Sequence, residues 1–211
     1  MFRDRVEAGR QLADALRGRV EDDVVVLGIP RGGVVVAAEV ARGLDCELDV
    51  VVPRKIGAPF NPELALGAIA AGVQVWDRDL IERLRIPERF LQDEVKAEEA
   101  EIERRTAVYR DDLPAAELAG RTVVLTDDGI ATGSTALAAL RWTKAQGAAR
   151  IVLAVPVAPP ETVERLRAEA DDVVVLLAPL GFHAVGEWYE RFDQTSDDEV
   201  VEALRAARDR G

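Results

Sequence analysis

Two adjacent carboxylates followed by a loop of small and hydroxylated residues form the part of the sequence best suited to chemistry. Asp127 and Asp128 lie within residues 123–135, which open on an apolar, β-branched run typical of a buried strand and lead into an apolar helical pattern. The first turn of a helix has backbone N–H groups without intrahelical acceptors and carries partial positive charge. The order of strand, acid pair, loop and helix therefore predicts an anion-binding site.

The side chains of this stretch suit the two parts of a sugar phosphate. Glycine lets the backbone approach an oxyanion closely, and hydroxyl groups donate hydrogen bonds to it. Asp127 and Asp128 cannot bind a phosphate, but they can accept hydrogen bonds from sugar hydroxyls. A plain surface turn is the alternative, and the common dinucleotide and triphosphate motifs are absent. The residues expected to hold the phosphate are Gly129, Ile130, Ala131, Thr132, Gly133, Ser134 and Thr135.

Two other predicted strands, over 24–29 and 48–52, end in loops that carry cations. Because ligands in open α/β sheets bind at the carboxyl ends of the strands, these loops predict a second anion contact near the acid pair. A tight turn with a solvated arginine, or a solvated surface pair, is the alternative. The residues concerned are Arg31, Gly32 and Gly33 in the first loop, and Arg54 and Lys55 in the second.

Residues 123–135 resemble the phosphoribosyl-diphosphate (PRPP) binding motif of the type I phosphoribosyltransferases, and the resemblance covers about residues 20–178. It implies an enzyme of the pentosyltransferase type, which moves ribose 5-phosphate from PRPP to a nitrogenous acceptor, such as a base, and releases pyrophosphate. The Ala-Pro-Phe-Asn-Pro-Glu stretch at 58–63 departs from the best-known base-salvage members. It resembles a less characterised branch, found alone or fused to hydrolase-like domains.

The resemblance also implies a role for each group of residues. The acid pair would hold the ribose hydroxyls and favour positive charge on the ring in an oxocarbenium-like transition state. The loop at 129–135 would bind the 5′-phosphate, and the two cationic loops would bind the pyrophosphate. Mg²⁺ is the implied cofactor, held by PRPP and in part by the acid pair through water. The catalytic residues implied are Asp127, Asp128, Arg31 and Lys55.

Residues 56–66 begin with a Gly/Pro-rich stretch that has no hydrophobic periodicity, which predicts an irregular loop. The family carries at this place a mobile loop that closes over the active site. Closure would exclude water, which would otherwise hydrolyse PRPP.

Aromatic residues gather in the tail that begins at residue 179, in a chain that is otherwise mostly aliphatic. In the family a variable hood covers the site and stacks on the ring of the acceptor. Packing of the tail onto the core is an equally good interpretation of the same residues. The residues are Phe182, Trp188, Tyr189 and Phe192.

Alternating strand and helix patterns predict one α/β domain over residues 1–211, with a mostly parallel sheet flanked by helices. The expected core spans 20–178, and a small hood spans 179–211. Further helices are predicted over 4–17, 87–109 and 197–208, and a short strand or a hairpin over 66–76.

The composition indicates which classes of partner the protein is expected to bind. The net charge of −12 disfavours nonspecific binding to nucleic acid and to anionic membranes, and no apolar run approaches 18 residues. Cys46 is the only cysteine, is expected to pack and not to react, and fits a cytoplasmic protein. The expected partners are PRPP and a small acceptor, and a homodimer is compatible with the resemblance. The alternative function is a PRPP-sensing regulatory protein without efficient transfer activity.

Overall fold

Five parallel strands form the centre of the computed structural model, which describes residues 1–20 and 23–209; residues 210 and 211 of the predicted hood lie outside the described residues. The sheet order is β2-β1-β6-β7-β8. Strand β1 is buried along its whole length, as expected for a strand covered on both faces. The strands are β1 (Val24–Gly28), β2 (Glu47–Val50), β6 (Thr122–Thr126), β7 (Arg150–Val157) and β8 (Asp172–Leu177).

Helices cover both faces of this sheet. Alternate residues of β1 point to opposite faces, so Val26 packs with one hydrophobic cluster and Leu27 with the other. The first cluster contains residues of α1 (Arg5–Leu16), α2 (Gly32–Leu44) and α7 (Asp197–Arg208), and the second contains residues of α5 (Ser134–Ala145) and α6 (Pro160–Leu166). The predicted fold class is confirmed. The core also includes Leu12 and Leu204, so α1 and α7 are integral to it.

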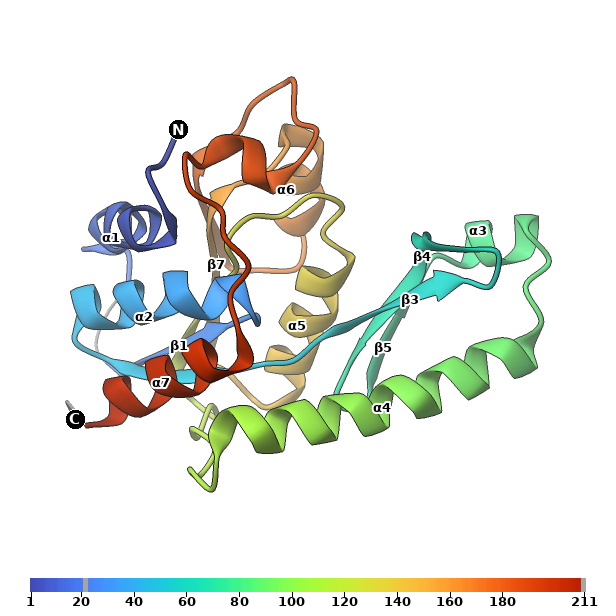
Figure 1. Cartoon of the computed structure of the whole chain (residues 1–211), viewed down its shortest axis with the longest axis horizontal. Helices are drawn as coiled ribbons and strands as arrows, with labels where there is room; N and C mark the ends of the chain where they lie inside the picture. The colour runs from blue at the N-terminus through green and yellow to red at the C-terminus, as the bar shows by residue number, and fades with distance from the viewer. Residues whose placement is uncertain (21–22, 210–211) are drawn as a thin grey trace.

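Residues 54–94 form an arm that projects from this core (Figure 1). It contains an antiparallel sheet of β3 (Arg54–Ala58), β4 (Asn61–Ala70) and β5 (Val73–Trp76), followed by α3 (Arg78–Arg83) and the start of α4 (Glu88–Arg110). The far end of α4 is fastened to the core, because Arg110 donates two hydrogen bonds of 3.0 Å to the buried carboxylate of Asp49.

The sequence-based interpretation of residues 54–63 is wrong in two respects. Arg54 and Lys55 do not end a strand of the main sheet, since β2 stops at Val50 and these residues begin β3. The stretch predicted as an irregular loop is a hairpin, in which β3 and β4 join through two residues. A β-bulge at Gly57 accommodates the irregular register, so a strand forms despite the glycine and the prolines.

The predicted hood begins as a separate segment that crosses the core before α7. In Figure 1 the orange-red chain runs from the short helix η1 (Val185–Trp188) down in front of the core to α7. The N-terminus pairs with this segment, since the N–H of Phe2 donates to the Trp188 carbonyl and the N–H of Glu190 donates to the Phe2 carbonyl, both at 2.8 Å. The hood, taken from here on as residues 179–196, is therefore joined to the start of the chain.

Candidate active site

The loops that follow β1 and β6 lie side by side at the carboxyl edge of the sheet. The N–H of Ile29 donates to the Thr126 carbonyl at 2.9 Å, so the two chains are still paired where they leave the sheet. The chain leaving β2 reaches the same edge, since the N–H of Val51 donates to the Gly28 carbonyl at 3.2 Å. The sheet order thus brings the acid loop and the Arg31 loop to one place, and the chain leaves the same edge after β2 before Arg54 and Lys55 enter β3.

Gly32 and Gly33 pack directly against the acid pair. A Cβ atom on Gly32 would lie 2.0 Å from Oδ2 of Asp128, and one on Gly33 would lie 2.7 Å from the Cα of Asp127. No larger residue fits at either position without displacing an acid. The predicted pyrophosphate loop and the predicted ribose-binding acids are therefore in van der Waals contact. A cis peptide bond joins Pro30 to Arg31 in this loop.

Hydrogen bonds from α6 and the backbone conformation of Gly133 fix the loop from 129 to 133. Gly133 has a φ of +74°, a left-handed conformation that favours glycine, and it directly precedes α5. The hydroxyl of Thr162 donates to the Ala131 carbonyl at 2.7 Å, and Arg165 donates to the Thr132 carbonyl.

These contacts use only carbonyls of the loop. Among the described residues, none accepts a hydrogen bond from the backbone N–H groups of 131–136. The N–H groups of Gly32 and Gly33, at the start of α2, also have no acceptor among the described residues. Two helix N-termini with unpaired N–H groups therefore flank the acids, and each can receive an anion.

Burial dominates the electrostatics of the acid pair. It raises the pKa of Asp127 well above its usual range, and the charge of Asp128 raises that pKa further. Burial also raises the pKa of Asp128, while the guanidinium of Arg5 acts in the opposite direction. A carboxylate pair of this kind, half-buried beside two helix N-termini, is costly to charge and suits a ligand that brings hydrogen-bond donors.

Arg5 belongs to the site although nothing in the sequence places it there. Its Nε donates to Oδ2 of Asp128 at 2.7 Å, and the side chain is only 12% exposed. The residue is the first of α1, which is capped by Asp4 and which the sequence predicts only as an amphipathic helix. A basic residue at a helix start carries no signal of a partner 123 positions away.

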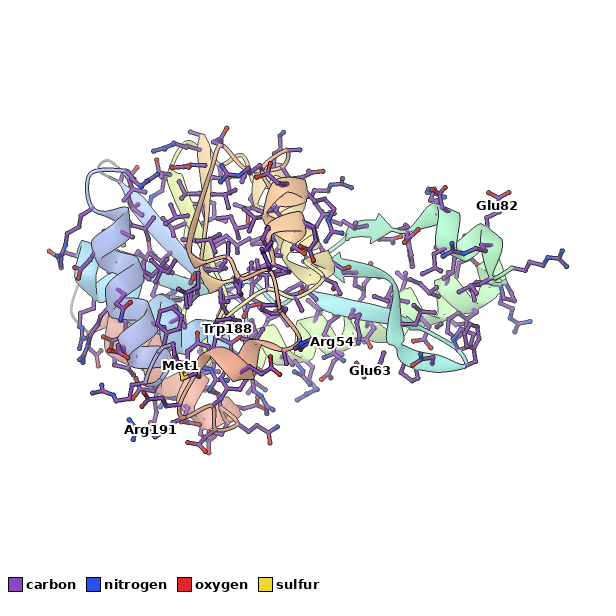
Figure 2. All side chains as sticks on the ribbon, turned by 90° about the horizontal axis from the view of Figure 1, so that it is seen from above. Met1, Arg54, Glu63, Glu82, Trp188 and Arg191 are labelled. Atoms are coloured by element: carbon purple, nitrogen blue, oxygen red, sulfur yellow. The ribbon has the colours of Figure 1, made fainter. Side chains whose placement is uncertain are left out.

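The three predicted cations all pair with acids. Nη1 of Arg31 lies 3.8 Å from Oδ1 of Asp197 at the start of α7. Arg54 donates to Glu98 on α4 at 2.5 Å, and Lys55 donates to Glu63 across the hairpin at 3.1 Å. Figure 2 shows Arg54 where the arm leaves the core, while Glu82 lies at the far end of the arm.

The predicted aromatic residues differ in their surroundings. Tyr189 is buried, lies 5.4 Å from the ring of Phe2 and stacks on Phe192 at 5.0 Å. Its hydroxyl donates to the Asp128 carbonyl at 2.5 Å, so burial and that acid's charge both raise the pKa of Tyr189. Trp188 is half-buried, and its indole Nε1 has no acceptor among the described residues.

Phe182 is half-buried, and Phe192 is 37% exposed beneath the Arg5 guanidinium, which lies 3.9 Å from its ring centre. Packing of the tail onto the core is thus established for Tyr189.

Other features lie outside this site. In the described part of the chain, no three His, Cys, Asp or Glu side chains group as metal ligands, and no helix is long and apolar enough to span a membrane. Burial raises the pKa of the Cys46 thiol to about 11. A hollow of about 770 Å³ on the arm, beside Trp76 and α4, contains none of the predicted site residues.

Comparison with known proteins identifies the class to which this fold and site belong. The chain matches the family model described as "Phosphoribosyl transferase domain" over residues 4–191. It therefore belongs to the phosphoribosyl transferase family, which confirms the resemblance drawn from residues 123–135.

Two curated proteins from two strains of Mycobacterium tuberculosis, both provisionally named as phosphoribosyl transferases, are 48% identical over 211 residues. The match covers 99% of this chain and 48% of each relative, so the chain spans about half the length of these relatives. The crystal structure of TT1426 from Thermus thermophilus is 47% identical, with a TM-score of 0.83 and 97% of each chain covered.

Proposed function

We propose that the protein transfers ribose 5-phosphate from PRPP to a nitrogenous acceptor, best sought among bases, and releases pyrophosphate. The observation that carries the proposal is the placement of one half-buried acid pair between two helix N-termini with unpaired N–H groups. PRPP has the matching layout, with ribose hydroxyls between a 5′-phosphate and a pyrophosphate. The loop at 129–135 would take the phosphate, and Gly32 and Gly33 the pyrophosphate.

The acids keep free capacity for the ribose. Oδ1 of Asp127 accepts from the backbone N–H of Asp128 at 2.8 Å, and Oδ2 of Asp128 accepts from Arg5. A hydrogen bond between the two carboxyl groups also influences the pKa of each, and their second oxygens become available to other donors when both groups are ionised. Two hydroxyls can donate there, and the negative charge favours the cationic ring of an oxocarbenium-like transition state.

Departure of the pyrophosphate needs positive charge nearby, which Arg31, Arg54 and Lys55 would supply by exchanging their acidic partners for the ligand. Half-buried carboxylates at this edge fit a hard cation held mainly by the substrate's oxygens and by water. Mg²⁺ bound in this way would lower the charge of the pyrophosphate. The binding steps themselves rest on this chain's N–H groups, cations and acids.

Phe182, Trp188 and Phe192 of the hood would line the acceptor pocket, while Tyr189 would anchor the hood. The same site without an acceptor pocket would serve a PRPP sensor, the second candidate function. The anion sites would serve both functions, and the aromatic hood favours the transferase. The composition further supports a cytoplasmic protein with small-molecule ligands, without nucleic acid or membrane, and a homodimer remains part of the proposal.

The test combines binding and turnover. PRPP with Mg²⁺ is titrated by calorimetry, and release of pyrophosphate is measured with a panel of purines, pyrimidines and other amines. Asp127→Asn with Asp128→Asn should lower affinity and turnover, because charge-assisted hydrogen bonds to the ribose are lost. The matched control is Asp14→Asn with Asp93→Asn, two exposed acids that pair with nearby arginines.

Unchanged PRPP binding in the double variant would remove the proposed role of the acids. Binding by the wild type without release of pyrophosphate for any acceptor would favour the sensor.

A further inference from the structure

One guanidinium meets three segments that are far apart in the sequence. Arg5 donates from Nε to Asp128 of the acid loop, and a Cβ on Gly32 would lie 2.5 Å from that same Nε. Its Nη1 donates to the Asp193 carbonyl of the hood at 2.7 Å, and its plane covers the ring of Phe192. The acid loop, the start of α2 and the hood therefore converge on Arg5.

These contacts use the shape of arginine and not only its charge. A planar guanidinium can donate in two directions while its face lies on an aromatic ring, whereas an ammonium group cannot do all three. The hydrogen bond to Asp128 is charge-assisted and mostly shielded from water, which places it among the stronger kinds. Gly32 provides the space, because any side chain there would displace the pair.

The hood touches the acid loop at two other places. The hydroxyl of Tyr189 donates to the Asp128 carbonyl, and Val185 fills the space beside Gly129. Neither contact reaches the carboxylate that would bind ribose. Arg5 joins that carboxylate itself to the hood backbone, so a shift of the hood would move or release Asp128.

On the basis of the proposed function, we propose that Arg5 is a positioning residue that fastens the hood to Asp128 and thereby couples ribose binding to closure of the acceptor pocket. Arg5 donates to Oδ2 of Asp128, so a ribose hydroxyl that donates to the other oxygen would bind together with the arginine and not in its place. A bound ribose would hold Asp128 in place, which stabilises its contact with Arg5 and hence the closed hood. The hood over the acceptor would then be ordered most firmly when the sugar is present.

Hydrogen exchange in the absence of ligand tests the link directly. We expect Arg5→Gln to speed amide exchange across 188–196 by about tenfold or more, because a charge-assisted hydrogen bond and a ring contact are lost. Arg5→Lys should give partial protection, since it keeps the charge but not the fork. Arg17→Gln is the matched control next to the same helix, where the arginine forms an exposed pair with Asp14.

Unchanged exchange of the hood in Arg5→Gln would overturn the proposal. If α1 itself loosens in that variant, Asp128→Asn provides the second measurement, because it weakens the acceptor of the Arg5 hydrogen bond and leaves α1 and the hood rings unchanged. Faster exchange of 188–196 in Asp128→Asn supports the link, and wild-type exchange there opposes it.

Binding of ribose 5-phosphate tests the coupling. We expect the ligand to slow exchange of 188–196 in the wild type and to bind about tenfold more weakly to Arg5→Gln, with part of the affinity restored in Arg5→Lys. Binding that leaves hood exchange unchanged would refute the coupling. If the wild type binds neither ribose 5-phosphate nor PRPP, the proposed function fails, while the exchange measured without ligand still decides whether Arg5 holds the hood.

Discussion

Replacing Gly32 by alanine should disable the site through one methyl group. Gly32 is the first residue of α2 and its φ is not positive, so the backbone itself accepts alanine, which usually favours a helix. The added Cβ would lie 2.0 Å from Oδ2 of Asp128 and 2.5 Å from Nε of Arg5. Ordinary contacts begin at 3.4 Å, so the carboxylate must retreat by more than 1 Å or the ion pair must break.

The expected losses follow from that displacement. Overpacking costs about 1–3 kcal/mol, which for a protein of this size lowers the Tm by about 2–12 °C. A misplacement of about 1 Å at a reacting group can cost about 10²-fold in rate. We therefore expect a modest fall in Tm together with a loss of PRPP affinity and turnover of about 10²-fold.

Calorimetry of unfolding and of PRPP binding measures both quantities. Gly181→Ala is the matched control, because a Cβ there meets no atom within 4 Å and the backbone is not left-handed. If Gly32→Ala matches Gly181→Ala in both Tm and affinity, the close packing of α2 against Asp128 is not required for the site.

Three further predictions concern charge. Asp127→Asn should stabilise the protein relative to the wild type by an amount that grows as the pH rises above about 4, because the unfolded aspartate then ionises while the raised pKa of folded Asp127 keeps that carboxyl protonated. The stabilities of variant and wild type in denaturant should diverge from about pH 4 to 8, and a constant difference would contradict the raised pKa. Asp49→Asn should lower the free energy of unfolding by about 3–5 kcal/mol, because it leaves Arg110 without a charged partner at the root of the arm, whereas Asp14→Asn should lower it little. If urea unfolding shows a loss below about 1 kcal/mol for Asp49→Asn, the pair does not fasten α4. Arg31→Gln and Lys55→Gln should each weaken pyrophosphate binding far more than ribose 5-phosphate binding in calorimetric titrations, and equal losses for both ligands would refute their assignment.

The fold and the anion loops could be predicted because their signals are local. A buried parallel strand is a continuous run of apolar and β-branched residues, as at 123–126, and β1, β6 and β7 each lead directly into a loop and a helix. The acid pair, Gly133 and the start of α5 follow one another in the chain, so their order alone indicates how they meet. The rule that ligands bind at the carboxyl strand ends then brings Arg31 to the same edge.

Residues whose partners are distant could not be found in this way. Arg5 acquires its role from Asp128, Asp193 and Gly32, all brought to it by the fold. The hairpin at 54–70 escapes prediction because glycine and proline usually mark loops, and only the bulge at Gly57 shows how a strand accommodates them. Sequence patterns report local conformation, whereas these features depend on tertiary contacts.

The three cations differ in what it costs them to leave their acidic partners, and this cost determines how readily each could bind a pyrophosphate. Lys55 pairs with a largely exposed Glu63, and exposed pairs contribute about 0–1 kcal/mol, so this exchange costs little. Arg31 stands 3.8 Å from Asp197, beyond a good hydrogen bond, and is also available. Arg54 meets Glu98 at 2.5 Å between β3 and α4, where a lost partner would leave a half-buried carboxylate. Pyrophosphate should therefore recruit Lys55 and Arg31 first, while Arg54 continues to hold the arm against α4.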